Sequence, residues 1–356
     1  MTGPRHELPV LQPRYPVYVI SKGRAFRPLT AKFLKRDGVP FKMVVEQSEY
    51  ADYVKSVGAE YVLPLPEDFR ERSKQDPRAG VVQGGGIPAR NFVWEHALAS
   101  GAKRHWILDD NIRDMIRLYK GQRIVCRAGP AFNAVESFVD RFTNVGVAGM
   151  NYKMFGFPRH PVFFLNVHVY SSILIRNDLP FRWRGRYNED TDLCLQALAN
   201  GWCTILTNIF LADKLPTLQM KGGNMDALYK GGEEAALGGG FKVGDGKTSN
   251  DSRFSSRLEM AKALERAWPG VVSVTRRFGR PQHMVDWRKF TTELEPTAEW
   301  AARYAAKPTG LLAEINEPQA GIEITDDEFG LELRPRVPVE TLDKEISAFY
   351  EANRRK

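Results

Sequence analysis

The segment His105-Trp106-Ile107-Leu108-Asp109-Asp110-Asn111 runs from a short apolar strand into a turn of three oxygen-bearing side chains. We call Asp109, Asp110 and Asn111 the acidic turn. In an open α/β sheet, ligands bind beyond the carboxyl ends of the strands, where this turn would lie. Carboxylate and amide oxygens suit a hard divalent ion such as Mg²⁺ or Mn²⁺. The alternative is a solvated turn that caps a following helix, since Asp and Asn also favour such turns.

Predicted strands and helices alternate on both sides of the acidic turn. Before it, the apolar spacing predicts strands at residues 15–21, 41–45 and 61–65, with helices that end near Gly38, Gly58 and Gly101. After it, extended segments are predicted at residues 145–150, 162–176 and 203–211, and helices at 130–143, 189–200 and 256–268. Such alternation predicts an α/β fold with parallel strands and crossover helices.

Length and composition allow one large α/β domain. The 356 residues, of which 43% are hydrophobic, suffice for a core and a C-terminal elaboration. No apolar run approaches the roughly 18 residues of a membrane span, and residues 1–14 lack the apolar segment of a secretory signal. The cysteines Cys126, Cys194 and Cys203 form no CxxC pair, so we expect buried thiols in a reducing cytoplasm.

A second acidic group opens the helix predicted at residues 189–200. It contains Glu189, Asp190 and Asp192. Carboxylates are stabilised in the first turn of a helix by the helix dipole, which is a sufficient structural reason for them. Alternatively, one of them acts as a general base on an acceptor hydroxyl group. The sequence leaves both interpretations open.

Basic and glycine-rich segments favour a phosphate-bearing ligand. Gly84-Gly85-Gly86, followed by Arg90 and Asn91, can hold a phosphate through backbone amides and a guanidinium group. This run matches neither GxGxxG nor GxxxxGK[ST], which counts against dinucleotide and P-loop sites. The net charge of +8 favours a polyanion or a nucleotide diphosphate as partner. Residues 221–250 are predicted to form a flexible glycine-rich loop, which we expect to act as a lid.

A basic cluster lies near residue 280, and histidines are scattered along the chain. Arg276, Arg277 and Arg280 are predicted to contact DNA or diphosphate phosphates, or else to form a basic surface. His283 is predicted to complete a metal site, although a lone histidine is more often no ligand. The remaining histidines that we weighed are expected in core or surface roles: His96, His105 and His168.

In this order, the segments resemble a GT-A glycosyltransferase over residues 15–212. The narrower resemblance is to the TET-associated glycosyltransferases of bacteriophages, which are associated with sugar addition to oxidised or hydroxymethylated DNA bases. Four motifs carry it: Val19-Ile20-Ser21-Lys22-Gly23-Arg24, Ile107-Leu108-Asp109-Asp110-Asn111, Asn188-Glu189-Asp190-Thr191-Asp192 and His283-Met284-Val285-Asp286-Trp287.

The resemblance implies a Rossmann-like mixed sheet flanked by helices, of the nucleotide-diphospho-sugar transferase type. The GT-A domain would span residues 15–290, and a C-terminal extension residues 291–356. Four groups of site residues are implied. Those that bind the nucleotide sugar are Ser21, Lys22, Gly23, Arg24, Glu46, Arg90, Asp109 and Asp110. The others are Asp190 and Glu189 for catalysis, Asp110, Asn111 and His283 for Mn²⁺ or Mg²⁺, and Arg276, Arg277 and Arg280 for DNA phosphates.

The implied reaction moves a hexose or pentose from a UDP-sugar to 5-hydroxymethylcytosine or 5-hydroxymethyluracil in phage DNA. It would take place in the cytoplasm of an infected bacterial host, away from membranes. Three alternatives stay open: a glycan or protein acceptor, a nucleotidyltransferase, and a catalytically decayed DNA-binding or assembly protein. One departure bears on the predicted metal dependence. GT-A enzymes usually carry Asp-x-Asp, and Asn111 stands at the last position, so the site would bind metal weakly, rely on Asp110, or work without metal.

Overall fold

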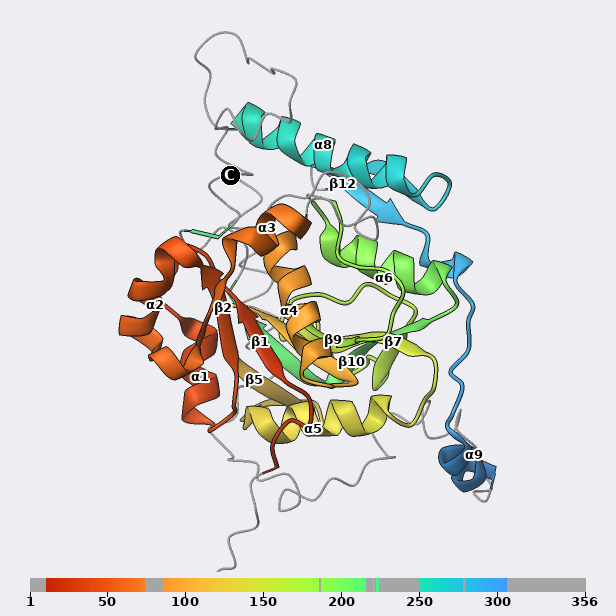
Figure 1. Ribbon diagram of the computed structural model, residues 1–356. Helices are drawn as coiled ribbons and strands as arrows, with labels where there is room; N and C mark the ends of the chain where they lie inside the picture. Colours follow the sequence, from red (N-terminus) through yellow and green to blue (C-terminus); the bar gives the residue numbers. More distant parts are fainter. Residues whose placement is uncertain are drawn as a thin grey trace, which may run out of the picture.

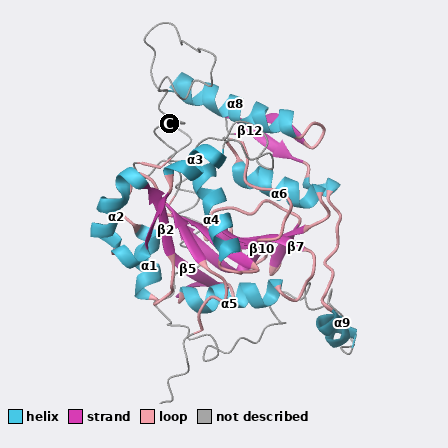
Figure 2. Cartoon of the chain, in the orientation of Figure 1, coloured by secondary structure: helices cyan, strands magenta, loops and turns pink. Residues whose placement is uncertain are grey.

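The computed structural model describes residues 11–73, 86–185, 187–215, 220, 222–223, 250–277 and 280–305. In these residues, helices cover both faces of a central mixed sheet (Figures 1 and 2). The strand order is β3-β2-β1-β4-β9-β7-β10-β5-β6, and β8 pairs with β10 outside this path. This architecture confirms the predicted α/β class and is that of a GT-A-like fold. Most of the predicted glycine-rich loop and the chain beyond residue 305 lie outside the described residues.

The first half of the sheet is parallel, as the alternation predicted. Its strands are β1 (Val17–Ile20), β2 (Lys42–Glu46), β3 (Val62–Leu65) and β4 (Arg104–Asp109). The helices that connect them are α1 (Leu29–Arg36), α2 (Tyr50–Val57), α3 (Glu67–Ser73) and α4 (Ile87–Ala99). Short 3₁₀ turns cover Gln47–Glu49 and Ala59–Tyr61. The sequence analysis did not predict α3.

The second half of the sheet is mixed. Its strands are β5 (Ile112–Tyr119), β6 (Gln122–Cys126), β7 (Val145–Tyr152), β8 (Phe163–Leu165), β9 (Ser172–Arg176) and β10 (Cys203–Lys214). Strand β9 runs antiparallel between β4 and β7, whereas β7 and β10 are parallel. The segment predicted as continuously extended at 162–176 is therefore two strands that pair with different neighbours.

The acidic turn leads into strand β5, so the prediction that it caps a helix is wrong. The solvated alternative is wrong as well, because Asp110 and Asn111 are only 3% and 6% exposed. The polar side chains are buried where the chain reverses from β4 into β5. Buried carboxylates require partners, and the site described below supplies them.

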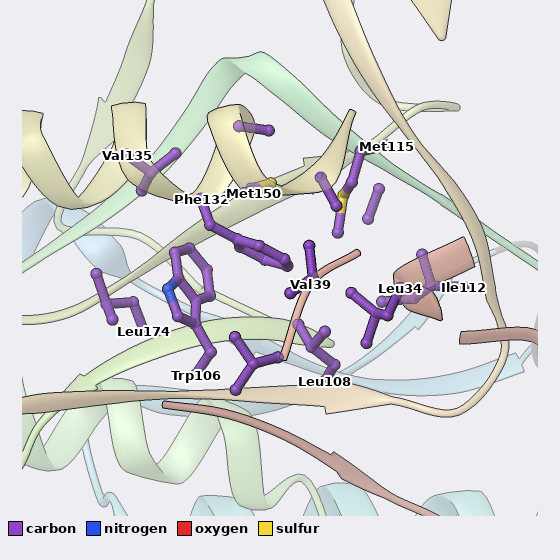
Figure 3. Close-up of a cluster of buried hydrophobic side chains, with 14 of the residues drawn as sticks. Leu34, Val39, Trp106, Leu108, Ile112, Met115, Phe132, Val135, Met150 and Leu174 are labelled. Atoms are coloured by element: carbon purple, nitrogen blue, oxygen red, sulfur yellow. The ribbon is translucent and has the colours of Figure 1, made fainter. Parts of the chain in front are cut away.

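The core has two layers, one on each face of the sheet. Trp106 and Leu108 of β4 pack towards α1 and α5 (Ala128–Val139), whereas Ile107 packs towards α4 and α6 (Glu189–Ala199). This alternation follows from the two-residue period of a strand. Figure 3 shows the first layer, where the rings of Trp106 and Phe132 lie together, with centroids 4.8 Å apart. All three cysteines are buried and unpaired, as predicted.

The C-terminal part of the described chain packs against α6. Helix α8 (Asn250–Ala267) and the hairpin of β11 (Val272–Arg277) and β12 (Arg280–Val285) lie beside it (Figure 1). A 3₁₀ turn (Trp287–Lys289) follows, and the segment before α9 (Ala298–Ala305) bonds back to the chain at residues 141–144. None of the helices in the described ranges is both long and apolar enough to cross a membrane.

Candidate active site

A pocket of about 440 Å³ opens along one edge of the sheet, within the range of about 300–1,000 Å³ typical of small-molecule sites. Polar side chains line it from neighbouring strands. In sheet order they are Glu46 at the end of β2, Ser21 after β1, Asp109 at the end of β4, Ser171 before the antiparallel β9, Tyr152 at the end of β7 and Lys214 at the end of β10. We call these six residues the polar row. The pocket lies beyond the carboxyl ends of the parallel strands, where the sequence predicted a ligand.

Most of the predicted site residues meet in this pocket. Those that line it are Ser21, Lys22, Arg24, Glu46, Arg90, Asp109, Asp110, Asn111, Glu189, Asp190 and His283. Gly23 lies within the same loop after β1. Arg276 is exposed on β11 and is absent from the pocket lining, and the side chains of Arg277 and Arg280 lie outside the described residues.

The loop of residues 21–24 is anchored to the acidic turn. Ser21 Oγ donates a hydrogen bond to one carboxylate oxygen of Asp110 at 2.6 Å, and Arg24 Nη1 contacts the other at 2.5 Å. Lys22 extends from the same loop towards Glu46, which also pairs with Arg70 at 3.2 Å. Asp110 therefore organises the loop, and two cations hold Glu46 at the pocket rim.

Residues 222–223 lie directly on the loop of residues 21–24. The backbone N–H of Gly223 donates to the carbonyl of Lys22 at 2.7 Å, and Arg24 Nη2 donates to the carbonyl of Gly222 at 3.0 Å. A Cβ on Gly222 would lie 2.4 Å from the carbonyl oxygen of Gly23, and the φ of Gly222 is +84°. Glycine is required there for both space and conformation.

Asp109 is held by a lysine that the sequence analysis did not single out. Lys214 Nζ lies 2.5 Å from Asp109 Oδ2, 2.7 Å from Ser171 Oγ and 3.1 Å from Tyr152 Oη. A bulge in the pairing of β10 with β5 falls between Ala212 and Lys214, and bulges re-aim side chains in this way. Burial opposes the ionised form of Asp109, but the charges of Lys214 and Arg90, together with hydrogen bonds from Lys214 and Ser171, outweigh it and lower the pKa of Asp109.

Ser171 has a left-handed backbone conformation with φ of +60°, which is rare for a residue other than glycine. Its hydroxyl donates to Asp109 at 2.7 Å and contacts Tyr152 Oη at 2.5 Å. Such strain persists only where surrounding contacts fix it, and it concentrates at functional sites. The hydroxyl network is therefore part of the site's construction.

The acidic start of α6 forms the opposite wall of the pocket. Asp190 Oδ2 lies 3.2 Å from His168 Nε2, and Glu189 Oε1 lies 3.4 Å from Arg90 Nη2. Burial acts to raise the pKa of Asp190, but His168, the charge of Arg90 and the backbone N–H of Thr191 together hold it well below its usual range. Burial, together with the charge of Asp190, raises the pKa of Glu189. His168, for which the sequence predicted a core or surface role, lies in the pocket lining against Asp190.

The predicted metal ligands do not form one ligand set. Both carboxylate oxygens of Asp110 are engaged by Arg24 and Ser21, and His283 lies near His168 and Asp190 instead. Asn111 does offer an unfilled oxygen, because its buried Oδ1 has no hydrogen-bond partner among the described residues. Within those same residues, no three His, Cys, Asp or Glu side chains are grouped to hold a metal ion. These residues do not fit the predicted Mn²⁺ or Mg²⁺ ion. Metal binding stays a prediction, which the titration described below tests.

Fold and site together define a class: a GT-A-like glycosyltransferase, with a loop after β1, an acidic turn after β4 and carboxylates opening α6. The sequence matches the model of the TET-Associated Glycosyltransferase family over residues 15–223, and the chain belongs to that family. The matched region includes the whole polar row and ends at Gly223. No curated protein and no solved structure matches the chain.

Proposed function

We propose that this glycosyltransferase moves a sugar from a UDP-sugar to the hydroxymethyl group of 5-hydroxymethylcytosine or 5-hydroxymethyluracil in phage DNA. The observation that carries the proposal is the pocket itself, in which the loop of residues 21–24, the acidic turn and the start of α6 face one another. Sugar transfer needs one group of side chains for the donor nucleotide, one for the departing diphosphate and one for the acceptor hydroxyl. The family match supports sugar transfer, and the acceptor is our proposal.

The donor nucleoside is assigned to the rim formed by Lys22, Glu46 and Arg70. Glu46 is held by both cations, so its carboxylate is positioned to accept hydrogen bonds from a ribose or a base. The diphosphate is assigned to the neighbouring region at Arg90, near the N-terminus of α4, which also lines the pocket. A helix N-terminus favours phosphate because its backbone N–H groups lack partners within the helix.

Asp190 is the proposed general base. The acceptor oxygen forms a bond to the anomeric carbon while the bond from that carbon to the diphosphate oxygen breaks, and its electron pair leaves with UDP. The acceptor proton passes to Asp190, which the lowered pKa keeps in the ionised form. The same shift reduces its strength as a base, so the assignment rests on the position of Asp190 in the pocket. Asp190 is also the more exposed of the two acids, with 29% of its side chain accessible against 19% for Glu189.

DNA is favoured as the acceptor by charge and by the family. The net charge of +8 attracts a polyanion, and Arg276 is exposed on β11, the strand paired to the one that carries His283 into the pocket. A hydroxymethyl group projects into the major groove, where it can be reached directly. The enzyme can otherwise take the base out of the stack.

The test incubates the full chain with radiolabelled UDP-sugars and DNA that contains either hydroxymethylated base, with unmodified DNA as the control. We expect label on hydroxymethylated DNA alone, and a nucleoside whose intact mass has increased by one sugar. Donor hydrolysis without labelled DNA for every sugar would contradict the DNA acceptor and favour a glycan or protein. A chain that neither hydrolyses nor transfers any donor would favour the decayed binding protein.

A further inference from the structure

The charged groups of the acidic turn are already neutralised by the chain itself. Asp110 is paired with Arg24, and Asp109 with Lys214 and, at 3.7 Å, with Arg90. The three cations come from the loop after β1, from α4 and from the end of β10. A divalent ion at Asp110 would have to displace Arg24 or Ser21, which engage both carboxylate oxygens. At Asp109 it would have to displace Lys214 from Oδ2 or enter between Oδ1 and Arg90, beside two cations.

All three cations border the pocket in which the donor diphosphate is expected. Only 11–13% of the Arg24, Arg90 and Lys214 side chains is exposed. Arg90 lies over the ring of Trp183 at 4.6 Å, and its Nε and Nη1 atoms are buried without hydrogen-bond partners among the described residues. These two atoms have almost no accessible surface, so the part of Arg90 that a diphosphate would meet is Nη2, which lies 3.7 Å from Asp109 and 3.4 Å from Glu189.

Lys214 has one contact that a ligand can replace. Its bonds to Asp109 and Ser171, at 2.5 Å and 2.7 Å, are short, whereas its contact with Tyr152 Oη is 3.1 Å. A phosphate oxygen approaching from the pocket can take the place of the Tyr152 hydroxyl and leave the ion pair intact. A charge-assisted bond to phosphate is stronger than a bond to a neutral hydroxyl.

We propose that Arg24, Arg90 and Lys214, held in place by the acidic turn, bind the donor diphosphate without a divalent ion. The acidic turn then acts as a scaffold for cations, and Lys214 supplies positive charge where a metal would otherwise stand. When the sugar leaves, the negative charge that develops on the diphosphate is stabilised by these fixed cations. The inference rests on the proposed function, because it assumes a nucleoside diphosphate donor.

The test is calorimetric titration of the full wild-type chain with UDP, once with excess EDTA and once with excess Mn²⁺. We expect the two dissociation constants to agree within about twofold, because the ion contributes nothing to the free energy of UDP binding. Loss of manganese hyperfine lines in electron paramagnetic resonance reports Mn²⁺ binding separately. Wild-type protein should cause no loss of those lines beyond that in a protein-free sample with the same UDP concentration.

The matched variants are Lys214→Met and Lys153→Met. Lys153 also pairs with an aspartate, Asp213 at 3.5 Å, but it does not line the pocket. We expect Lys214→Met to weaken UDP binding by about tenfold or more and Lys153→Met to leave it unchanged. Thermal unfolding confirms that each variant is folded. If Lys214→Met does not fold, the two wild-type titrations still decide the question.

The outcomes separate the two proposals. UDP binding that requires Mn²⁺ would overturn the inference and leave sugar transfer intact. Metal-free UDP binding that depends on Lys214, without transfer to hydroxymethylated DNA, would support the inference and count against the acceptor. Absence of binding to UDP and to every other nucleoside diphosphate, with and without Mn²⁺, would overturn both.

Discussion

Glu189 and Asp190 are adjacent in the sequence but face different partners. Glu189 lies against Arg90, which also approaches Asp109, whereas Asp190 lies against His168. His168 in turn lies parallel to Trp287, with ring centroids 6.3 Å apart. One carboxylate therefore belongs to the diphosphate side of the pocket and the other to the acceptor side. Substitutions of the two residues should therefore affect different kinetic constants.

Asp190→Asn should lower kcat by about 10²–10⁴-fold, the usual contribution of a general base, with little change in donor KM. Glu189→Gln should chiefly raise the donor KM, because it releases Arg90. Steady-state kinetics with a UDP-sugar measures both, and Glu259→Gln on α8, at a half-buried residue outside the pocket lining, is the control. A larger fall in kcat for Glu189→Gln than for Asp190→Asn would assign the base to Glu189.

The sequence analysis found the acids of the site and missed their partners. Asp109, Asp110, Glu189 and Asp190 stand in recognisable motifs at predicted strand or helix ends. His168, Ser171, Tyr152 and Lys214 stand in no motif, and they enter the pocket because of the strand order. One signal was available: Lys214 is the last residue of the long, mostly apolar strand β10, where an unpaired charge would be costly.

At the scale of elements, residues 222–223 are bonded to the loop of residues 21–24, so the two segments form one unit. Arg24 bonds to Asp110 on one side and to the carbonyl of Gly222 on the other. The unit thus connects the acidic turn to the beginning of the predicted glycine-rich loop. A change in the position of residue 222 is expected to reach the donor site through Arg24.

Gly222→Ala should weaken UDP binding by about tenfold, or about 1.4 kcal/mol. The new Cβ would lie 2.4 Å from the carbonyl oxygen of Gly23, so residue 222 and the loop of residues 21–24 would have to move apart. Gly270→Ala is a matched control, because its φ is also positive, at +75°, but no atom lies within 4 Å of the new Cβ. Both variants should lose about 1–2 kcal/mol of stability from backbone strain. Equal UDP affinity in the two variants would contradict a role for this contact.

Elements were more predictable than their arrangement. The apolar period and glycine stops predicted β1 to β4, α5 and α6 to within a few residues. They could not predict that β9 would enter between β4 and β7, because backbone pairing of distant strands leaves no local pattern. The β5–β6 hairpin and α3 were missed, and the hairpin of β11 and β12 was interpreted as a basic segment alone.

At the scale of the whole molecule, His105 ties stability to pH. Its ring is fully buried, with Nδ1 2.5 Å from Asn177 Oδ1 and no hydrogen-bond partner for Nε2 among the described residues. Burial lowers the pKa of His105 from 6.5 to about 4. The unfolded chain therefore binds one more proton at this position between those two values, and the native state loses stability as the pH falls through that window.

Wild-type protein should lose about 3 kcal/mol of unfolding free energy from His105 between pH 6.5 and pH 4. His105→Asn keeps a donor near Asn177 but cannot titrate, so its stability should fall less steeply over this range. Urea unfolding at several pH values measures the slopes, with His160→Asn as a comparison at a half-buried ring. Parallel slopes for His105→Asn and wild type would show that His105 does not titrate as a buried group.

The polar row has a consequence for biosynthesis. Lys214 reaches Asp109 across 105 positions of sequence, and the residues between them supply two other members of the polar row, Tyr152 of β7 and Ser171 before β9. Contacts of such separation form late, because closing long loops costs entropy first. A nascent chain that has emerged only as far as α6 already carries Asp109, Asp190 and Glu189, but no lysine faces the acidic turn. We therefore expect the enzyme to be inactive on the ribosome, with donor binding beginning once β10 has joined the sheet.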